Sequence, residues 1–535
     1  MRRYFPDIDT FRAAAQGADV VPVYRQLLAD HLTPVTAFEV LGRDDHAFLL
    51  ESVVGGERIA RYSFIATSPA LVYQAAGGRA SVTRTGRLAG APDTFATTDP
   101  LADLQKLLPR RSYRRDPGLP AFTGGLVGYA GYDTIRYYEG EKLPRPPRDD
   151  RKLPDVLFGL YNELVVFDHV DKTIKVIANA QLKGSGFGVP GSGQGSEFRV
   201  QGSGDERTAP SALNSEPRTL NPEDAYRDAC RRIDELVTRL QQPPTSKLGE
   251  IDPRGPLSLK YESNQSREQF EGAIRAGQEY IKAGDIFQFV PSQRLRVPSH
   301  ADPFDVYRAL RIINPSPFMF YLKSPTCTLI GSSPEILCRV EGRHVTTRPL
   351  AGTRRRGATQ AEDEALEKEL LADPKERAEH IMLVDLHRND IGRVSRIGSV
   401  KVDDVMSVER YSHVMHITTN VTGELAEGMT ALDALRVSLP VGTVSGAPKI
   451  RAMQIIDELE PTRRGPYGGA VGYLDFAGDM DTCIALRTIV WRNGTFDVQA
   501  GAGVVADSVP SAEFEETMNK AKAMLKAVQL AEEGF

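Results

Sequence analysis

The chain has 535 residues, of which 41% are hydrophobic and 26% charged, so it can form about two to four domains with an ordinary core. Its formal net charge of −5 argues against a nucleic-acid-binding protein, and the arginine clusters at 110–115 and 354–356 are interpreted as solvated loops. No apolar signal segment and no apolar run of roughly 18 residues occurs, so we expect neither a secreted nor a membrane protein. Four well-separated cysteines without a CxxC favour a reducing, cytoplasmic location.

Helix and strand patterns are mixed in the N-terminal region, residues 1–182. Val20–Leu32 has an amphipathic pattern that predicts a helix. Apolar runs between turn residues predict strands at His46–Ser52, Tyr62–Ile65, Leu157–Phe167 and Thr173–Ala178. The Gly-rich run Gly124–Tyr132 is not followed by a GxGxxG spacing, so it indicates strands that approach closely rather than a phosphate-binding loop.

Two connecting regions come next. Residues 183–219 are rich in Gly and Ser and have almost nothing to bury, which predicts a flexible insertion. Within residues 220–260, Pro222–Gln241 has helical periodicity, and a polar, Pro-rich connection follows it.

The region 261–530 has the densest pattern of elements. Helices are predicted at Arg267–Ala283, Pro303–Ile313, Ala361–Leu371, 374–392 and the C-terminus. Strands are predicted at Ile286–Leu295, Phe318–Lys323, Thr326–Ser332, Ile336–Val340, His344–Arg348, Met415–Gly423, Tyr467–Phe476, Cys483–Val490, Thr495–Ala500 and Gly503–Ala506. Because hairpins join these strands, an α+β fold is predicted rather than βαβ alternation.

Two of the predicted helices carry a pair of glutamates three residues apart. Glu376 and Glu379 share one face of the helix 374–392, whose apolar run from Ile381 onward predicts that it enters the core. Glu513 and Glu516 stand on the C-terminal helix, with Lys520 four residues later. Each pair alone is typical of a solvated helix face. Together, however, the pairs can hold one Mg²⁺ ion between them, because that cation prefers oxygen ligands.

Other motifs carry little by themselves. Gly442–Lys449 has the wrong spacing for a P-loop, and Gly501–Gly503 is a lone GxG between strands. His416 in an apolar strand is ordinarily a core histidine that has its hydrogen bonds satisfied.

A wider set of motifs resembles the chorismate-utilising enzymes, and within them the anthranilate synthase component I family. The motifs are AEHIMLVDLHRNDIGRV, VMHITTNVTG, LPVGTVSGAPKIRAMQIIDELE, YGGAVGY, ALRT and GAGVVADSVPSAEFEETMNKAK, with LLES and RYSF in the N-terminal half. This resemblance implies a lyase in which two large antiparallel sheets pack as a sandwich with helices outside. It also implies that 261–530 is the chorismate-binding catalytic domain and that 1–182 holds a feedback site.

The resemblance assigns roles to individual positions. Glu379 and Glu516 match Mg²⁺ ligands, with Glu376 and Glu513 as close partners. Glu335 matches the general acid, and His416 a histidine near the departing groups. The matches to chorismate-contacting positions are Gly352, Thr353, Thr443, Tyr467, Arg487, Gly501, Ala502, Gly503 and Lys520. The planar fork of an arginine such as Arg487 suits a carboxylate.

Two positions separate the subfamilies that the resemblance leaves open. Relatives that add water carry a lysine base where this chain has Gln288, and a neutral amide suits ammonia, which needs no base. Aminodeoxychorismate synthases often carry a nucleophilic lysine in PIKGT, where this chain has PLAGT with Ala351. The resemblance therefore implies free ammonia as the nucleophile, with aminodeoxychorismate synthase and a non-catalytic amino-acid-binding module as alternatives.

The same resemblance implies partners and regulation. No glutaminase motif is found up to Phe535, so we expect a separate glutamine amidotransferase subunit to supply ammonia, and we expect an oligomer. LLES and NPSPFM match the family's tryptophan feedback site. Glu51, Ser52 and Arg61 would bind the charged end of tryptophan, while Pro317, Phe318 and Met319 would line the indole site.

Overall fold

The computed structural model describes residues 3–28, 30–52, 61–85, 89–108, 112–182, 221–246, 249–411 and 414–535. The predicted insertion at 183–219 lies outside these residues. Among the helices of the described ranges, none combines the length and the apolar character that a membrane crossing requires.

Strands from both halves of the chain form the first antiparallel sheet. In spatial order they are β1 (Val20–Leu28), β10 (Thr173–Gln181), β9 (Glu163–Asp168), β3 (Tyr62–Thr67), β2 (Ala47–Glu51), β14 (Phe318–Lys323), β15 (Thr328–Ser333), β24 (Thr488–Arg492), β25 (Thr495–Gly501), β13 (Ser292–Pro298) and β11 (Glu262–Ser263). The two halves meet where β2 pairs with β14, with Glu51 opposite Met319. Two segments that are far apart in the sequence are therefore neighbours.

The second sheet is built in the same mixed way. Its order is β18 (Leu350–Arg355), β20 (Val414–Glu424), β17 (His344–Thr347), β16 (Ile336–Glu341), β23 (Met480–Ile484), β22 (Ala470–Asp475), β7 (Gly125–Ala130), β8 (Val156–Tyr161), β4 (Leu71–Ala76), β5 (Arg79–Arg84) and β6 (Asp93–Ala96), and β19 (Lys401–Arg410) pairs with β20. A Cβ added at Gly128 in β7 would lie 2.0 Å from the carbonyl oxygen of Leu157. The prediction that the Gly-rich run lets strands approach closely is confirmed.

The two sheets pack face to face through an aromatic and aliphatic layer. Phe48 of the first sheet meets Tyr161 of the second edge-on, with ring centroids 4.8 Å apart. Further along the layer, Phe320 and Leu329 pack with Tyr129 and Val471. The predicted α+β sandwich is confirmed.

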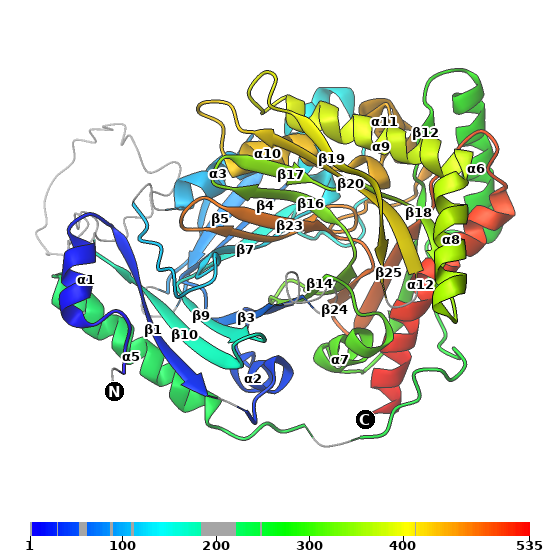
Figure 1. Cartoon of the computed structure of the whole chain (residues 1–535). Coiled ribbons are helices and arrows are strands. Elements are labelled where there is room, and N and C mark those ends of the chain that lie inside the picture. The colour runs from blue at the N-terminus through cyan, green and yellow to red at the C-terminus, as the bar shows by residue number, and fades with distance from the viewer. Residues whose placement is uncertain are drawn as a thin grey trace, which may run out of the picture.

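Helices cover the outer faces of the sandwich, as Figure 1 shows. The first sheet is covered by α1 (Ile8–Ala15), α2 (Pro34–Leu41), α5 (Pro222–Leu240), α7 (Pro303–Ile313) and α12 (Pro510–Glu533). The second sheet is covered by α3 (Pro100–Leu107), α9 (Pro374–Gly392) and α10 (Ala431–Ser438), and α8 (Gln360–Ala372) packs beside β18 and β20. α6 (Arg267–Lys282) and α11 (Lys449–Leu459) enclose the short strand β12 (Gln288–Phe289), which pairs with β21 (Gly446–Ala447). The remaining short helices are α4 (Arg136–Glu139) and the 3-10 turns η2 (Tyr132–Ile135), η3 (Gly140–Lys142) and η4 (Gly442–Val444).

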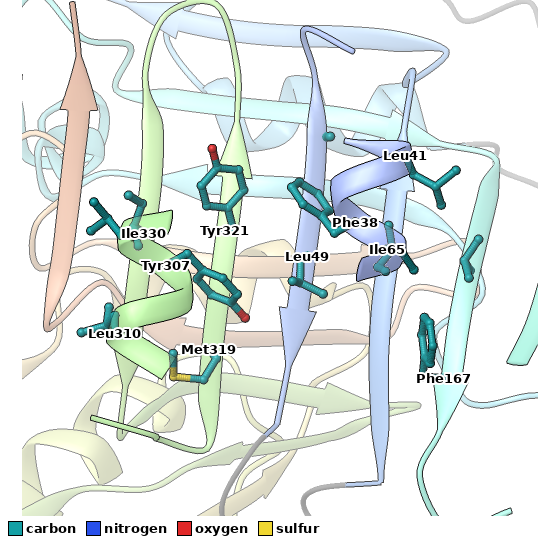
Figure 2. Packing of buried hydrophobic residues seen from close by; sticks show 14 of the residues in the cluster. Phe38, Leu41, Leu49, Ile65, Phe167, Tyr307, Leu310, Met319, Tyr321 and Ile330 are labelled. Atoms are coloured by element: carbon teal, nitrogen blue, oxygen red, sulfur yellow. The ribbon is translucent and has the colours of Figure 1, made fainter. Parts of the chain in front are cut away.

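Figure 2 shows how α2 and α7 lie over the junction between the two halves. Phe38 and Leu41 of α2 and Tyr307 and Leu310 of α7 pack over Leu49, Ile65, Met319, Tyr321 and Ile330. Asp302 accepts a hydrogen bond from the Phe304 N–H and Pro303 occupies the first turn, so the start of α7 is fixed locally.

Several sequence-based predictions are wrong in the described chain. Leu157–Phe167 and Ile286–Leu295 are not single strands, because each is divided between two different sheets. The arginine cluster at 354–356 is not a solvated loop, because Arg354 and Arg355 belong to β18.

Val20–Leu32 is not a helix: it contains β1, an edge strand that tolerates Pro22. The predicted strand Cys483–Val490 is interrupted between β23 and β24, because Arg487 takes a φ of +46°. Gly503–Ala506 forms a single bridge, from Val504 to Phe289, rather than a strand.

The helix α9 also differs from its prediction. Ile381 is 51% exposed, so the apolar run does not enter the core as a whole. Its buried face includes His380, Leu383, His387 and Ile391. The domain boundaries at 182, 219 and 260 stay a prediction, although both sheets take strands from each side of them.

Candidate active site

The two glutamate pairs, on α9 and α12, are close enough for charges on one helix to affect the other. Burial raises the pKa of Glu379, and the charges of Glu376 and Glu516 raise it further. Burial likewise raises the pKa of Glu513, and the charge of Glu516 raises it further. Lys375 lowers both pKa values, so one lysine lies near carboxylates of both helices. The fold therefore brings together acidic side chains more than 130 residues apart.

Each carboxylate already has a partner. Glu379 accepts a hydrogen bond of 3.0 Å from the Gln288 amide, and Glu516 forms an ion pair of 2.6 Å with Lys520. Glu376 lies 3.3 Å from Arg354. Among the described residues, no three acidic, histidine or cysteine side chains converge closely enough to hold a metal in this arrangement. The all-oxygen donor set fits Mg²⁺, provided that the Lys520 and Arg354 contacts give way to the cation.

Glu335 lies in the link between β15 and β16, at the end of a strand from the first sheet. It is 2% exposed, and burial raises its pKa to about 8. Thr443 in η4 donates a hydrogen bond of 3.0 Å to Glu335, and Arg487 also favours the ionised form. Glu335 is therefore mostly protonated at neutral pH, as a general acid must be.

His416 in β20 is held by one ring nitrogen and leaves the other without a partner. Its Nδ1 lies 2.8 Å from the carbonyl oxygen of Gly352 and 3.1 Å from the Thr353 hydroxyl. A carbonyl accepts only, so Nδ1 carries the proton. Burial lowers the pKa of His416 to about 4. The buried Nε2, which has no hydrogen-bond partner, is then a neutral acceptor.

Arg487 is the cation of the site. Within the described chain it forms no ion pair, and burial lowers the pKa of its guanidinium. Its positive φ interrupts the strand, while its carbonyl accepts a hydrogen bond of 3.2 Å from the Ser332 N–H. A partly buried arginine that forms no ion pair with a carboxylate of the described residues suits an anionic ligand, because an unpaired charge is costly to desolvate.

The segment 501–503 lies beside Lys520, Tyr467 and Gln288. Lys520 donates a hydrogen bond of 3.0 Å to the carbonyl oxygen of Gly501, and a Cβ added there would lie 3.0 Å from the Tyr467 hydroxyl. A Cβ at Gly503 would lie 2.8 Å from the Gln288 amide nitrogen. Ala502 is fully buried between them. Both glycines therefore keep space open beside side chains of the candidate site.

The predicted feedback residues are only partly brought together. Glu51 is 5% exposed, accepts a hydrogen bond of 2.6 Å from Tyr307 and lies 2.8 Å from Arg311. Ser52 has a buried hydroxyl that finds no hydrogen-bond partner among the described residues. Arg61 instead donates two hydrogen bonds, of 3.1 and 3.0 Å, to Asp168.

The second feedback segment lies on the neighbouring strand. Met319 of β14 pairs with Glu51 on one side and with Ser332 of β15 on the other. Met319 is buried, Phe318 and the adjacent Pro317 begin this strand, and Phe318 pairs with Ser333. Glu335 follows two residues after Ser333, so the strand of this feedback segment is the direct neighbour of the strand that leads to the candidate acid.

Sequence reasoning missed three residues of this region. The Tyr411 ring lies 5.6 Å from the His416 ring, and burial raises the pKa of the Tyr411 hydroxyl above its ordinary value. Arg464 and Glu460 form a fully buried ion pair beneath Tyr467. Tyr411 follows a strand of ambiguous pattern, but the Glu-x-x-x-Arg spacing in ELEPTRRG was visible in the sequence.

Comparison with known proteins agrees with this fold. A family model described as chorismate binding enzyme matches residues 45–526. The chain belongs to this family, and it is an enzyme of the chorismate-utilising class.

Within this family, the chain is similar to anthranilate synthase proteins over nearly its full length. The chain is 45% identical to "Anthranilate synthase component 1" of Acetivibrio thermocellus over 99% of both chains. It is also 45% identical to the protein of the same name from Pseudomonas aeruginosa over 98% of both. The crystal structure of anthranilate synthase component I from Streptococcus pneumoniae is similar with a TM-score of 0.70, at 36% identity, covering 93% of this chain and 98% of that one.

Proposed function

We propose that this chain is the synthase subunit of an anthranilate synthase. It aminates chorismate with ammonia at C2, eliminates pyruvate and releases anthranilate, the first committed step of tryptophan biosynthesis. The observation that carries the proposal is the grouping of protonated Glu335, neutral His416 and unpaired Arg487. The similarity to anthranilate synthases over nearly the full length supports it.

Substrate binding follows from the charges of the site. Arg487 holds one carboxylate of chorismate through its planar fork. The backbone of 501–503, Tyr467 and Lys520 contact the same dianion, and Gly352, Thr353 and Thr443 border the ring. When bound, Mg²⁺ would be held by Glu379 and Glu516, with Glu376 and Glu513 beside them, and it would neutralise the ring carboxylate.

Proton transfer is assigned to Glu335. Ammonia forms the new bond at C2, both conjugated ring double bonds shift, and the C4 hydroxyl leaves as water with the Glu335 proton. The added nitrogen then releases one proton, which balances the proton that Glu335 gave. We assign the stabilisation of the second step to the Nε2 acceptor of His416. In that step the C2 proton is lost, the C3–O bond breaks, and the enolpyruvyl group leaves as pyruvate.

The nucleophile is assigned from Gln288 and Ala351. Gln288 is neutral and donates to Glu379, so no base is present at the position where a water-adding enzyme would need one. Ala351 is buried in β18 and offers no amine for covalent attack. These residues favour free ammonia and count against the aminodeoxychorismate alternative.

A separate glutamine amidotransferase subunit would supply this ammonia in the cytoplasm, within an oligomer. The purified chain, given chorismate, ammonium and Mg²⁺, is expected to produce anthranilate fluorescence, whereas glutamine alone should produce none. Robust turnover with glutamine alone would contradict the separate subunit. Tryptophan binding without any chorismate turnover would favour the regulatory-module alternative.

Feedback inhibition by tryptophan is proposed at the β2–β14 junction. Ser52, with its free buried hydroxyl, would bind the amino-acid end together with Glu51, and Pro317, Phe318 and Met319 would line the indole. Arg61 must first leave Asp168 to take part.

Ser52→Phe is expected to raise the tryptophan concentration for half-inhibition by at least about tenfold, because a phenyl ring would fill the space of the ligand. Ammonium-dependent turnover should change less than about twofold. Ser52→Ala, which removes only the hydroxyl, serves as the matched variant and should have a smaller effect. An unchanged inhibition curve in Ser52→Phe would place the feedback site elsewhere.

A further inference from the structure

Arg464 is among the largest fully buried side chains of the described protein, and it contacts none of the reacting groups assigned above. Its Nη1 donates a hydrogen bond of 2.6 Å to the carbonyl oxygen of Val444, and its Nη2 donates one of 2.6 Å to that of Val290. Its Nε donates to Glu460 at 2.9 Å. One guanidinium thus ties together three separate segments.

Two of these segments carry residues of the candidate site. Val444 ends η4, in which the preceding Thr443 donates to Glu335. Val290 lies two residues after Gln288, whose amide donates to Glu379. Arg464 therefore holds both the segment of Thr443, which donates to the candidate acid, and the segment of Gln288, which donates to Glu379.

The acidic partner of the pair fixes a third segment. Glu460 accepts hydrogen bonds of 2.8 Å from both the N–H and the hydroxyl of Ser292. Ser292 pairs with Gly501 across β13 and β25. The Arg464 guanidinium also lies 5.7 Å from the Tyr467 ring centroid, so the ion pair supports both sides of the chorismate-contacting segment.

We propose that the Arg464–Glu460 ion pair is a positioning element that holds η4, β12 and the β25 end in the relative arrangement that turnover requires. This inference rests on the proposed function for its kinetic readout. Only arginine fits the position, because its planar fork donates in three fixed directions at once. A lysine keeps the charge but cannot hold two carbonyls and a carboxylate in that geometry.

The principal variant is therefore Arg464→Lys. At saturating ammonium it is expected to lower kcat/KM for chorismate by about 100-fold, the size of loss that a displacement near 1 Å causes in an active site. At fixed free ammonia, the alkaline limb of the pH profile should move to higher pH, because Glu335 loses the Thr443 hydrogen bond that lowers its pKa.

A second variant guards against misfolding. Removing one partner leaves a buried charge, but replacing both with apolar residues, Arg464→Met with Glu460→Met, can preserve stability. This double variant should unfold within a few degrees of the wild type and still lose about 100-fold in kcat/KM. Wild-type kcat/KM in either variant would overturn the proposal.

The matched control is an ion pair close to the end of α11. Arg136 of α4 and Asp457 of α11, three residues before Glu460, form a partly buried bidentate pair with hydrogen bonds of 2.9 and 2.6 Å, and it contacts none of the assigned site residues. Arg136→Lys is expected to leave kcat/KM within about threefold of the wild type. An equal loss in this control would mean that the Arg464 effect is general destabilisation, which contradicts a positioning role.

Hydrogen exchange separates this proposal from the proposed function. In Arg464→Lys, amide protection should fall in 286–292 and 441–447 and stay unchanged in Arg136→Lys. If the wild type makes no anthranilate, the proposed function fails, while the exchange result still tests the positioning. Unchanged protection in both segments would overturn the positioning role whatever the activity.

Discussion

Replacing Glu335 with glutamine is expected to lower kcat for ammonium-dependent anthranilate formation by about 10²–10⁴-fold, the usual contribution of a positioned general acid. Glutamine keeps the size and the hydrogen-bonding capacity of the side chain but has no proton to give the departing hydroxyl. Burial of Glu335 already favours a neutral side chain, so the variant should fold normally. Chorismate affinity, measured by calorimetry, should change much less than kcat.

The pH dependence of turnover tests the same assignment of Glu335 as the general acid. The pKa of Glu335 is raised to about 8, so the acid is protonated below that pH and turnover should fall as the pH rises through it. The measurement needs a constant concentration of free ammonia. Thr443→Val removes the hydroxyl that stabilises the carboxylate, so the alkaline limb should move upward. A limb that is the same in Glu335→Gln and the wild type would contradict the assignment.

Replacing Glu379 and Glu516 with glutamine, singly, is expected to raise the Mg²⁺ concentration for half-maximal activity by about 100-fold or more. Changing only a hydrogen-bond partner of a metal ligand already costs about 10–100-fold. The charge contribution is clear here, because the charge of Glu516 raises the pKa of Glu379 and a cation would relieve that repulsion.

Thermal unfolding tests the same site without activity. Added Mg²⁺ should raise the Tm of the wild type, because a ligand that binds only the folded state stabilises it, and should leave the Tm of both variants unchanged. Glu515→Gln is the matched control, since Glu515 stands next to Glu516 but pairs with Arg267 at 2.8 Å. If Mg²⁺ stabilises the Glu379→Gln and Glu516→Gln variants as it does the wild type, the ion binds elsewhere.

Local signals explain which elements could be predicted from the sequence. The helix α7 and strand β14 have the predicted bounds, because a capping aspartate, Pro303 and an apolar run define them without help from the rest of the chain. β1 could not be predicted in this way. Its burial follows from pairing with β10, more than 140 residues later, and that contact overrides the helical periodicity of Val20–Leu32.

The candidate site likewise has features that the sequence predicts and contacts that only the fold determines. The two glutamate pairs are visible as patterns, whereas their mutual approach depends on how α9 and α12 pack on different sheets. The chorismate contact expected of Arg487 rests on the family resemblance. The interruption of its strand depends on a left-handed φ that no residue pattern indicates. The Glu-x-x-x-Arg spacing of Glu460 and Arg464 is visible in ELEPTRRG, but the hydrogen bonds of Arg464 to the Val444 and Val290 carbonyls depend on the fold.

Mass spectrometry of the product formed from chorismate and heavy-nitrogen ammonium tests the central claim most directly. The account predicts labelled anthranilate together with an equimolar amount of pyruvate. A labelled product that keeps the enolpyruvyl group, or an unlabelled product, would contradict it.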